Sequence, residues 1–184
     1  MPENRLGITE PAELAREEER ISKKKALLLF ESGLLDTMEA GTFDSLAKIH
    51  RFLFEDIYDF AGEVRKVNIA KGNFRFAPLM YLPASLENID KMPQSAFDEI
   101  IEKYVEMNIA HPFREGNGRS MRSWLDQILK NNPLKNGLTD EIAQLSDVTG
   151  IRIQDRLSVT LRRDGAETKK AAVVVLSRKD FERE

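Results

Sequence analysis

The sequence predicts a mainly α-helical protein with one short β-hairpin, followed by a β-rich C-terminal appendage. Over most of residues 11–130, apolar side chains recur at spacings of three, four and seven, the periodicity of helices with one buried face. Alternation of apolar and polar residues, which is typical of strands, is confined to residues 64–76 and to the region after Pro133. We therefore expect a helical domain over residues 1–133 and an appendage over residues 134–184.

Composition limits the classes of protein that fit. A chain of 184 residues with 41% hydrophobic residues is long enough for one compact domain with a modest appendage. Its 28 basic and 31 acidic residues nearly balance, so charge gives no reason to expect nucleic acid or an anionic membrane as a partner. The absence of cysteine excludes disulfides and thiolate metal sites. Without a bilayer-spanning apolar run or a signal peptide, we expect a cytoplasmic location.

The first predicted helix covers residues 11–30. Pro11 suits a first helical turn, and Gly33 is a plausible stop. Charged residues fill most of the surface of this helix, while a sparse apolar stripe repeats every seven residues. The predicted buried face consists of Leu14, Ile21 and Leu28.

The second predicted helix runs from Thr42, a suitable N-cap, to about Asp59, and Gly62 ends it. Its apolar stripe consists of Leu46, Ile49, Leu53 and Ile57. His50 lies on the same stripe, so we interpret it as a core histidine with a local hydrogen bond and no catalytic role.

A hairpin follows, because residues 64–69 and then Phe74 and Phe76 alternate with a period of two. Its turn is predicted at Lys71, Gly72 and Asn73. Two further helices are expected, over residues 81–92 with Pro83 in the first turn and from Ser95 to about His111.

The C-terminal region has a different pattern. Residues 134–145 could form a loop and a short helix. Alternating apolar residues indicate strands at 151–153 and 157–161, and Asp164 with Gly165 supplies a turn before a final strand over 171–177. This pattern is the basis for the β-rich appendage.

The stretch HPFREGNGRSMR, residues 111–122, is the most informative in the chain. It contains one of only two histidines, then a carboxylate, two glycines around an asparagine, and two arginines three residues apart. Proline and glycine disfavour a helix here, whereas the apolar positions at 121, 124, 125 and 128 predict one directly afterwards. The stretch is therefore a polar loop that leads into a helix.

Such a loop suits a phosphate. The first four amides of a helix have no partner inside it, so the N–H groups of Gly116, Asn117 and Gly118 would face an anion. Arg119 and Arg122 fall on one side of the helix and could hold successive phosphates. A P-loop is excluded, since no Gly-Lys-Ser or Gly-Lys-Thr follows the glycines.

Glu115 and His111 add the remaining chemistry. Glu115 would repel a phosphate unless a cation lay between them, and Mg²⁺ is commonly held by one or two carboxylates together with substrate phosphates. His111, with an ordinary pKa of about 6.5, could accept a proton from an incoming hydroxyl. Each residue alone is more often structural, but their order within one loop indicates phosphoryl or nucleotidyl transfer to a hydroxyl.

With every specified position matched, residues 111–122 resemble the Fic family signature, His-x-Phe-x-Asp/Glu-Gly-Asn-Gly-Arg-x-x-Arg. The segments IHRFLFEDIYDFAGEVR and IAKGNFRFAP are also similar to family segments, so the resemblance covers roughly residues 5–130. It implies a Fic-like helical core with a hairpin flap. It also implies an Mg²⁺-dependent transfer of AMP from ATP to a Tyr, Thr or Ser hydroxyl of a target protein, or of the chain itself.

The resemblance implies a role for each loop residue. His111 would be the general base, Glu115 the Mg²⁺ ligand, and Phe113 the anchor of the loop in the core. Arg119 would contact a phosphate and Arg122 the γ-phosphate. The anion hole would comprise Gly116, Asn117 and Gly118.

The predicted hairpin resembles the family's flap, which holds a target segment by strand addition. Its docking residues would be Lys71, Gly72, Asn73 and Phe74. From the sequence alone, these residues could equally form a plain surface hairpin.

The sequence contains no complete match to the inhibitory motif of the family. Many relatives carry an inhibitory Ser/Thr-x-x-x-Glu-Gly/Asn motif, whose glutamate pairs with the second arginine. The nearest matches here, residues 9–13 and 95–99, lack the final Gly or Asn. The region after Pro133 does not resemble the helices expected to close the core, and Ser123 replaces an expected apolar residue. An inhibitory partner protein could therefore join ATP and the target as partners.

Two alternatives stay open. A Doc-like relative transfers the γ-phosphate and acts as a protein kinase, although the intact Gly-Asn-Gly-Arg run favours AMP transfer. A non-catalytic module that binds a partner and has an idle nucleotide pocket would fit the replaced C-terminal region.

Overall fold

A computed structural model describes residues 2–72, 74–131, 157–163 and 166–173. Two short 3-10 helices, η1 (Leu34–Thr37) and η2 (Leu79–Tyr81), accompany the α-helices of this part of the chain. These are α1 (Pro11–Glu31), α2 (Phe43–Phe54), α3 (Leu82–Asp90), α4 (Phe97–Ala110) and α5 (Asn117–Asn131). The mainly α-helical fold is confirmed, and none of the described helices is long and apolar enough to cross a membrane.

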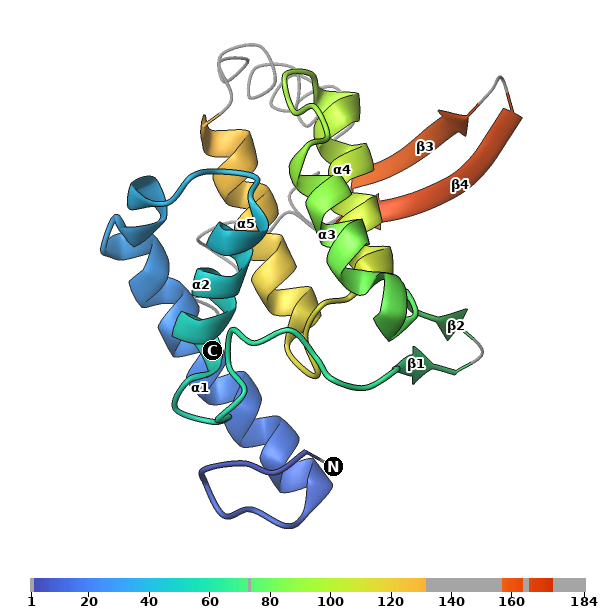
Figure 1. Ribbon diagram of the computed structural model, residues 1–184. Coiled ribbons are helices and arrows are strands. Elements are labelled where there is room, and N and C mark those ends of the chain that lie inside the picture. Colours follow the sequence, from blue (N-terminus) through green and yellow to red (C-terminus); the bar gives the residue numbers. More distant parts are fainter. Residues whose placement is uncertain (1, 73, 132–156, 164–165, 174–184) are drawn as a thin grey trace.

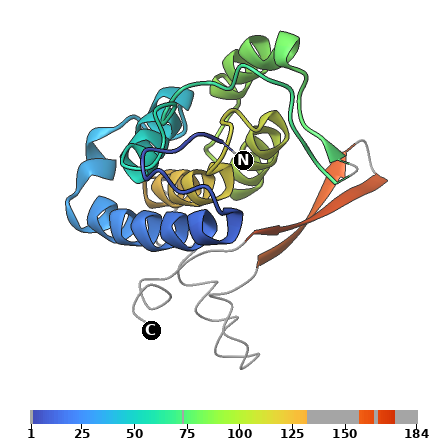
Figure 2. The ribbon, with the colours of Figure 1, turned by 90° about the horizontal axis from the view of Figure 1, so that it is seen from below.

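Helix α5 runs through the middle of the helical domain, with α1 and α2 on one side and α4 on the other (Figures 1 and 2). Trp124 of α5 is fully buried, and its Nε1–H donates to the Thr42 carbonyl at 3.0 Å, which ties α5 to the start of α2. The core between the helices includes Leu46, Ile49, Leu53, Ile100, Ile101, Met107, Met121, Leu125 and Ile128.

The ends of α1 are as predicted, and so is part of its buried face, because Leu14 is buried and Ile21 packs against the core. Pro11 occupies the first turn, and Gly33, with φ 70°, lies in the left-handed conformation just beyond the helix. Leu28 is 45% exposed, so its predicted burial is wrong. The buried residues of α1 are Leu14, Glu18, Ser22, Ala26 and Leu29.

Helix α2 begins as predicted, because the Thr42 hydroxyl accepts the amide of Ser45 at 3.2 Å and caps the helix. It ends at Phe54 rather than near Asp59. The Ile57 amide donates to the Phe54 carbonyl three residues back, at 2.9 Å, so the chain tightens into turns there. Ile57 is nevertheless fully buried, which is why its apolar character suggested a longer helix.

The predicted hairpin exists, but its strands are shorter than the alternating pattern suggests. Strand β1 (Ala70–Lys71) pairs antiparallel with β2 (Phe74–Arg75), in the register Ala70 with Arg75 and Lys71 with Phe74. Residues 64–69 are not strand. The Arg65 amide donates to the Pro112 carbonyl of the 111–122 loop at 2.8 Å, whereas the Ile69 carbonyl accepts the Phe76 amide across the hairpin at 3.4 Å.

A second antiparallel hairpin lies in the C-terminal region, formed by β3 (Leu157–Arg163) and β4 (Ala166–Val173). The strand predicted at 157–161 falls within β3. The expected elements at 134–145, 151–153, 164–165 and 174–177 lie outside the described residues, and the domain boundary at residue 133 stays a prediction.

Candidate active site

The loop between α4 and α5 turns sharply at His111. This residue follows the last residue of α4 and has φ 50° and ψ 65°, in the left-handed region that non-glycine residues rarely adopt. Its amide donates to the Met107 carbonyl at 3.0 Å, so the unusual backbone conformation also ends the helix. The imidazole of His111 is half-buried.

The contacts of the His111 ring leave one nitrogen for chemistry. Nδ1 lies 3.2 Å from the Asn108 carbonyl oxygen, which can only accept, so Nδ1 carries the proton and Nε2 has a lone pair. One face stacks on Phe76, just after β2, with centroids 3.7 Å apart and an angle of 18°. Burial, with a smaller effect of the cations Arg65 and Lys71, lowers the pKa of His111 and favours the neutral ring.

The side chain of Asn117 closes the loop on itself. The Phe113 amide donates to Asn117 Oδ1 at 2.9 Å, and Asn117 Nδ2 donates to the Phe113 carbonyl at 2.7 Å. Phe113 is fully buried, with its ring stacked on His50 at 3.8 Å. The start of α5 is therefore fixed to the core through both residues.

The two glycines of the loop differ in what they allow. Gly116 has φ 75°, and a Cβ at this position would lie 2.5 Å from the Phe54 ring, so only glycine fits. Gly118 is exposed, and a Cβ there would come no closer than 3.4 Å to Arg122. Helix α5 begins at Asn117, so the amides of Asn117, Gly118 and Arg119 belong to its first turn and can bind an anion.

The buried His50 holds this loop in place through a hydrogen bond, a role that the sequence did not reveal. Its hydrogen bond is not local: Nε2 donates to the Glu115 carbonyl at 2.8 Å, 65 residues away. The Gly62 amide donates to Nδ1 at 2.9 Å, so both nitrogens are occupied. Burial lowers the pKa of His50 to about 4, which keeps the ring neutral.

Glu115 lies at the outer edge of the loop and is exposed. Partial desolvation by nearby protein atoms raises its pKa, against a smaller opposite effect of Arg114. No group of three or more imidazole or carboxylate side chains gathers among the described residues. A divalent cation held by Glu115 would therefore need phosphate or water oxygens to complete its shell, which is the pattern that Mg²⁺ prefers.

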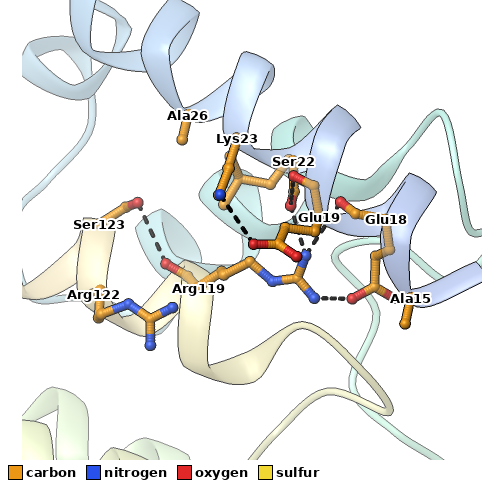
Figure 3. Close-up of a pocket in the computed structure, with 10 residues that line it drawn as sticks. Ala15, Glu18, Glu19, Ser22, Lys23, Ala26, Arg119, Arg122 and Ser123 are labelled. Atoms are coloured by element: carbon orange, nitrogen blue, oxygen red, sulfur yellow. Dashed lines mark hydrogen bonds and ion pairs between the residues drawn. The ribbon is translucent and has the colours of Figure 1, made fainter. Parts of the chain in front are cut away.

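Arg119 points to α1, a partner that the sequence did not suggest. Its guanidinium forms an ion pair with Glu18 and donates to Ser22 Oγ at 2.6 Å (Figure 3). It also lies over the Phe54 ring. The other oxygen of Glu18 accepts the Tyr58 hydroxyl. Burial, together with nearby Arg122, lowers the pKa of Arg119 to about 10. The predicted phosphate contact is thus already engaged by α1.

Arg122 lines a cavity of about 390 Å³ between α1 and α5 (Figure 3). Its Nε is buried and has no hydrogen-bond partner in the described part of the chain. Among the described residues, neither Glu13 nor Glu99, the glutamates of the two possible inhibitory motifs, forms a hydrogen bond or an ion pair with Arg122. Glu99 instead caps α4 by accepting the amides of Ser95 and Ala96, and Glu13 is exposed in the first turn of α1.

The predicted flap residues lie at the surface. Lys71, Gly72 and Phe74 are exposed, whereas Asn73 lies outside the described residues. Phe76, which was not among the predicted site residues, joins the flap to the site through its stack on His111. The hairpin and the loop are therefore neighbours.

The structure brings most of the predicted loop residues together and, besides Phe76, reveals three supporting side chains that sequence reasoning missed. His111, Asn117 and Gly116 converge where α4 ends and α5 begins. The missed residues are His50, Glu18 and Ser22. A signal for two of them existed, since Leu14, Glu18, Ser22 and Ala26 follow one another every four residues on α1.

Comparison with known proteins matches residues 41–129 to the Fic/DOC family. The protein adenylyltransferase VbhT of Bartonella schoenbuchensis is 33% identical, over 69% of this chain and 28% of its own length. The probable protein adenylyltransferase Fic of Salmonella typhimurium is 31% identical, over 68% of this chain and 66% of its own. The chain thus spans less than two thirds of either relative.

Solved structures agree on the fold. The N-terminal FIC domain of Bep8 from Bartonella sp. 1-1C has a TM-score of 0.61 at 20% identity, over 71% of this chain and 70% of that one. BepC from Bartonella tribocorum, solved with bound AMPPNP, has a TM-score of 0.56 at 17% identity, over 82% and 86%. At these identities the likeness concerns the helical fold with its hairpin.

Proposed function

This chain belongs to the Fic/DOC family, and from that premise we propose that it is a protein adenylyltransferase, which moves AMP from ATP to a Tyr, Thr or Ser hydroxyl of a target protein. The observation that carries the proposal is the position of the His111 ring. It stacks on the end of the hairpin and belongs to the same short loop as the free amides of α5. The proposed base, the proposed anion site and the proposed docking edge are therefore neighbours.

His111 is proposed as the general base. Its Nδ1 is committed to the Asn108 carbonyl, so the Nε2 lone pair is the one available to accept the proton of the target hydroxyl. The hydroxyl oxygen then attacks the α-phosphorus of ATP, the bond from that phosphorus to the bridging oxygen breaks, and pyrophosphate leaves. The proton on Nε2 is later released to solvent, which restores the base.

The amides at the start of α5 are proposed to stabilise the charge that develops on the α-phosphate. Gly116 lets the backbone approach closely, and the exposed Gly118 leaves room for the phosphate oxygens. Arg122 is proposed to hold the γ-phosphate, since its buried Nε lacks a partner among the described residues. Arg119 would have to share its guanidinium between Glu18 and a phosphate.

Glu115 is proposed as the ligand of Mg²⁺. When bound, this ion would offset the charge of the phosphates and of the departing pyrophosphate. The Glu115 carboxylate forms no ion pair among the described residues, and desolvation raises its pKa. A bound cation would stabilise the charged carboxylate and so lower this pKa, and the charged carboxylate would in turn attract the cation.

The hairpin is proposed to dock the target segment. Of the six large hydrophobic residues exposed among the described residues, Phe74 lies in β2 and Val67 lies three residues before β1, whereas Met80 and Tyr81 lie in η2. Exposed apolar side chains beside a short strand edge favour binding of an extended peptide, which adds main-chain hydrogen bonds to side-chain contacts.

Incubation with labelled ATP tests the proposal. The protein is mixed with Mg²⁺ and cell lysate, in parallel with ATP labelled at the α-phosphate and ATP labelled at the γ-phosphate. The α-label is expected on protein, and mass spectrometry should find an added AMP. A band that carries only the γ-label would instead indicate a kinase, and no label from either nucleotide, with Mg-ATP binding retained, would indicate a non-catalytic module.

A further inference from the structure

A buried arginine, Arg65, connects the hairpin to the 111–122 loop. It is only 3% exposed. On the loop side, its amide donates to the Pro112 carbonyl at 2.8 Å and its Nε to the His111 carbonyl at 2.8 Å. On the hairpin side, Nη1 donates to the Val67 carbonyl at 2.6 Å and Nη2 to the Ala77 carbonyl, while Nη2 also lies 3.2 Å from the Ala110 carbonyl.

These contacts bracket the hairpin. Val67 precedes β1 and Ala77 follows β2, so one guanidinium holds both ends of the flap. The same group holds the last residue of α4 and the residue that carries the proposed base. A planar group with donors in a fixed fork can bind carbonyls in several directions, whereas an ammonium group cannot hold the same set at once.

The charge of Arg65 is balanced by backbone dipoles. No ion pair between Arg65 and a carboxylate is recorded for the described residues, and desolvation lowers its pKa. The carbonyls of Ala110 and His111 belong to the C-terminal end of α4, where the helix dipole is negative and favours a cation. A neutral side chain of similar volume would fill the space but would leave several buried carbonyls unpaired.

From this geometry we propose that Arg65 is a positioning residue, which locks the flap and the His111 loop into one unit so that a docked hydroxyl and the base keep a fixed relation. The inference deepens the proposed function and rests on it for its catalytic consequence. The coupling of the two segments is a property of the free protein and can be measured without any substrate.

Hydrogen–deuterium exchange of full-length variants tests the coupling. In Arg65→Gln, amides of residues 66–78 and 108–114 are expected to exchange at least about tenfold faster than in the parent, while those of α2 keep their protection. Arg65→Lys should show the same pattern, because the fork is lost even though the charge remains. Lys66→Gln is the matched control, since it removes a neighbouring charge that is exposed, and should leave both segments unchanged.

Kinetics provide a second readout. Both Arg65 variants should lower kcat for AMP transfer to below about a tenth of the parent value, with KM for ATP nearly unchanged, because the anion site is intact. Two cations act on the His111 ring, Arg65 from the segment before β1 and Lys71 from β1 itself. Loss of the Arg65 charge in Arg65→Gln should therefore raise the pKa of His111 and shift the acid limb of the pH–rate profile to higher pH. Arg65→Lys keeps a charge and should not shift it.

The outcomes separate this inference from the proposed function. Exchange that stays at the parental level in both segments, or that rises equally throughout the helices, would overturn the coupling, since Arg65 would then be dispensable or an ordinary core residue. If the parent transfers no AMP at all, the proposed function fails, yet the exchange data still decide whether Arg65 couples the flap to the loop.

Discussion

The two histidines of this chain support opposite ends of the same loop, and their surroundings differ in one decisive respect. His50 lies under the loop, fully buried, with both ring nitrogens occupied by backbone groups. His111 lies at the start of the loop, half-buried, with one nitrogen occupied. Both rings stack on a phenylalanine, at 3.8 Å and 3.7 Å.

The difference shows what separates a structural histidine from a candidate base. Aromatic stacking and a lowered pKa are common to both rings, so neither feature identifies the base. The distinguishing feature is Nε2 of His111, which has no hydrogen-bond partner among the described residues, because a proton can be accepted only at a lone pair that no protein donor already occupies. Variants at and around the two rings test this difference.

The largest effect is expected for His111→Ala. AMP transfer should fall by a factor of about 10² to 10⁴, the usual contribution of a general base, because the imidazole proposed to accept the hydroxyl proton is removed. Stability should change little, since the ring is half-buried and makes one hydrogen bond. Quantification of the α-label on protein gives the rate, and a thermal melt gives the stability. Transfer at the parental rate would remove His111 from the chemistry.

The next largest effect is the pH dependence of the free energy of unfolding, to which His50 contributes. Its folded-state pKa of about 4 lies below the unfolded value, so the folded protein binds fewer protons and its stability is complete only above about pH 6.5. The free energy of unfolding should then fall by roughly 3 kcal/mol as pH drops from about 6.5 to about 4. Urea titrations across this range measure the slope.

His50→Gln serves as the control for that slope. The amide cannot titrate, so most of the pH dependence in this window should disappear, whereas His111→Ala should remove only a smaller part. An unchanged slope in His50→Gln would mean that other groups are responsible for the acid sensitivity.

A smaller loss is expected from Gly116→Ala. The positive φ and the 2.5 Å approach to Phe54 both oppose a side chain, so stability should drop by about 2 kcal/mol. Gly118→Ala is the matched control, because its nearest contact of 3.4 Å is ordinary. That variant should melt near the parent temperature, yet bind Mg-ATP more weakly, as measured by calorimetry. Equal melting of the two variants would contradict the difference between the glycines.

The smallest effect is expected from Phe76→Leu, which removes the ring stacked on His111. An aromatic pair contributes about 0.5–1.5 kcal/mol beyond its buried area, so kcat should fall by no more than about tenfold. In an NMR titration, the chemical shift of the His111 ring protons should change. The ring protons of His50, which stacks on Phe113 instead, serve as an internal reference. A perturbed His50 signal would reveal a general repacking instead.

Much of the helical fold was predictable because its signals are local. The positions of Pro11, Thr42 and Gly33 at helix ends follow from caps and backbone preferences that act within a few residues. The loop from 111 to 122 was equally readable, since its residues lie next to one another in the chain.

Features that depend on distant partners could not be predicted. Glu18 and Ser22 are buried because Arg119, about a hundred residues later, requires their oxygens. The alternation at 64–69 resembled a strand, yet that segment pairs with the loop through Arg65. The His50 partner was likewise invisible, because polar groups on an apolar stripe show that a partner exists but not which one.

The two hydrogen bonds between Asn117 and the backbone of Phe113 have a thermodynamic consequence. A loop that is already folded before its ligand arrives loses almost no conformational freedom on association. Encounter with a nucleotide should then be rapid and limited by diffusion and orientation, without a slow rearrangement step.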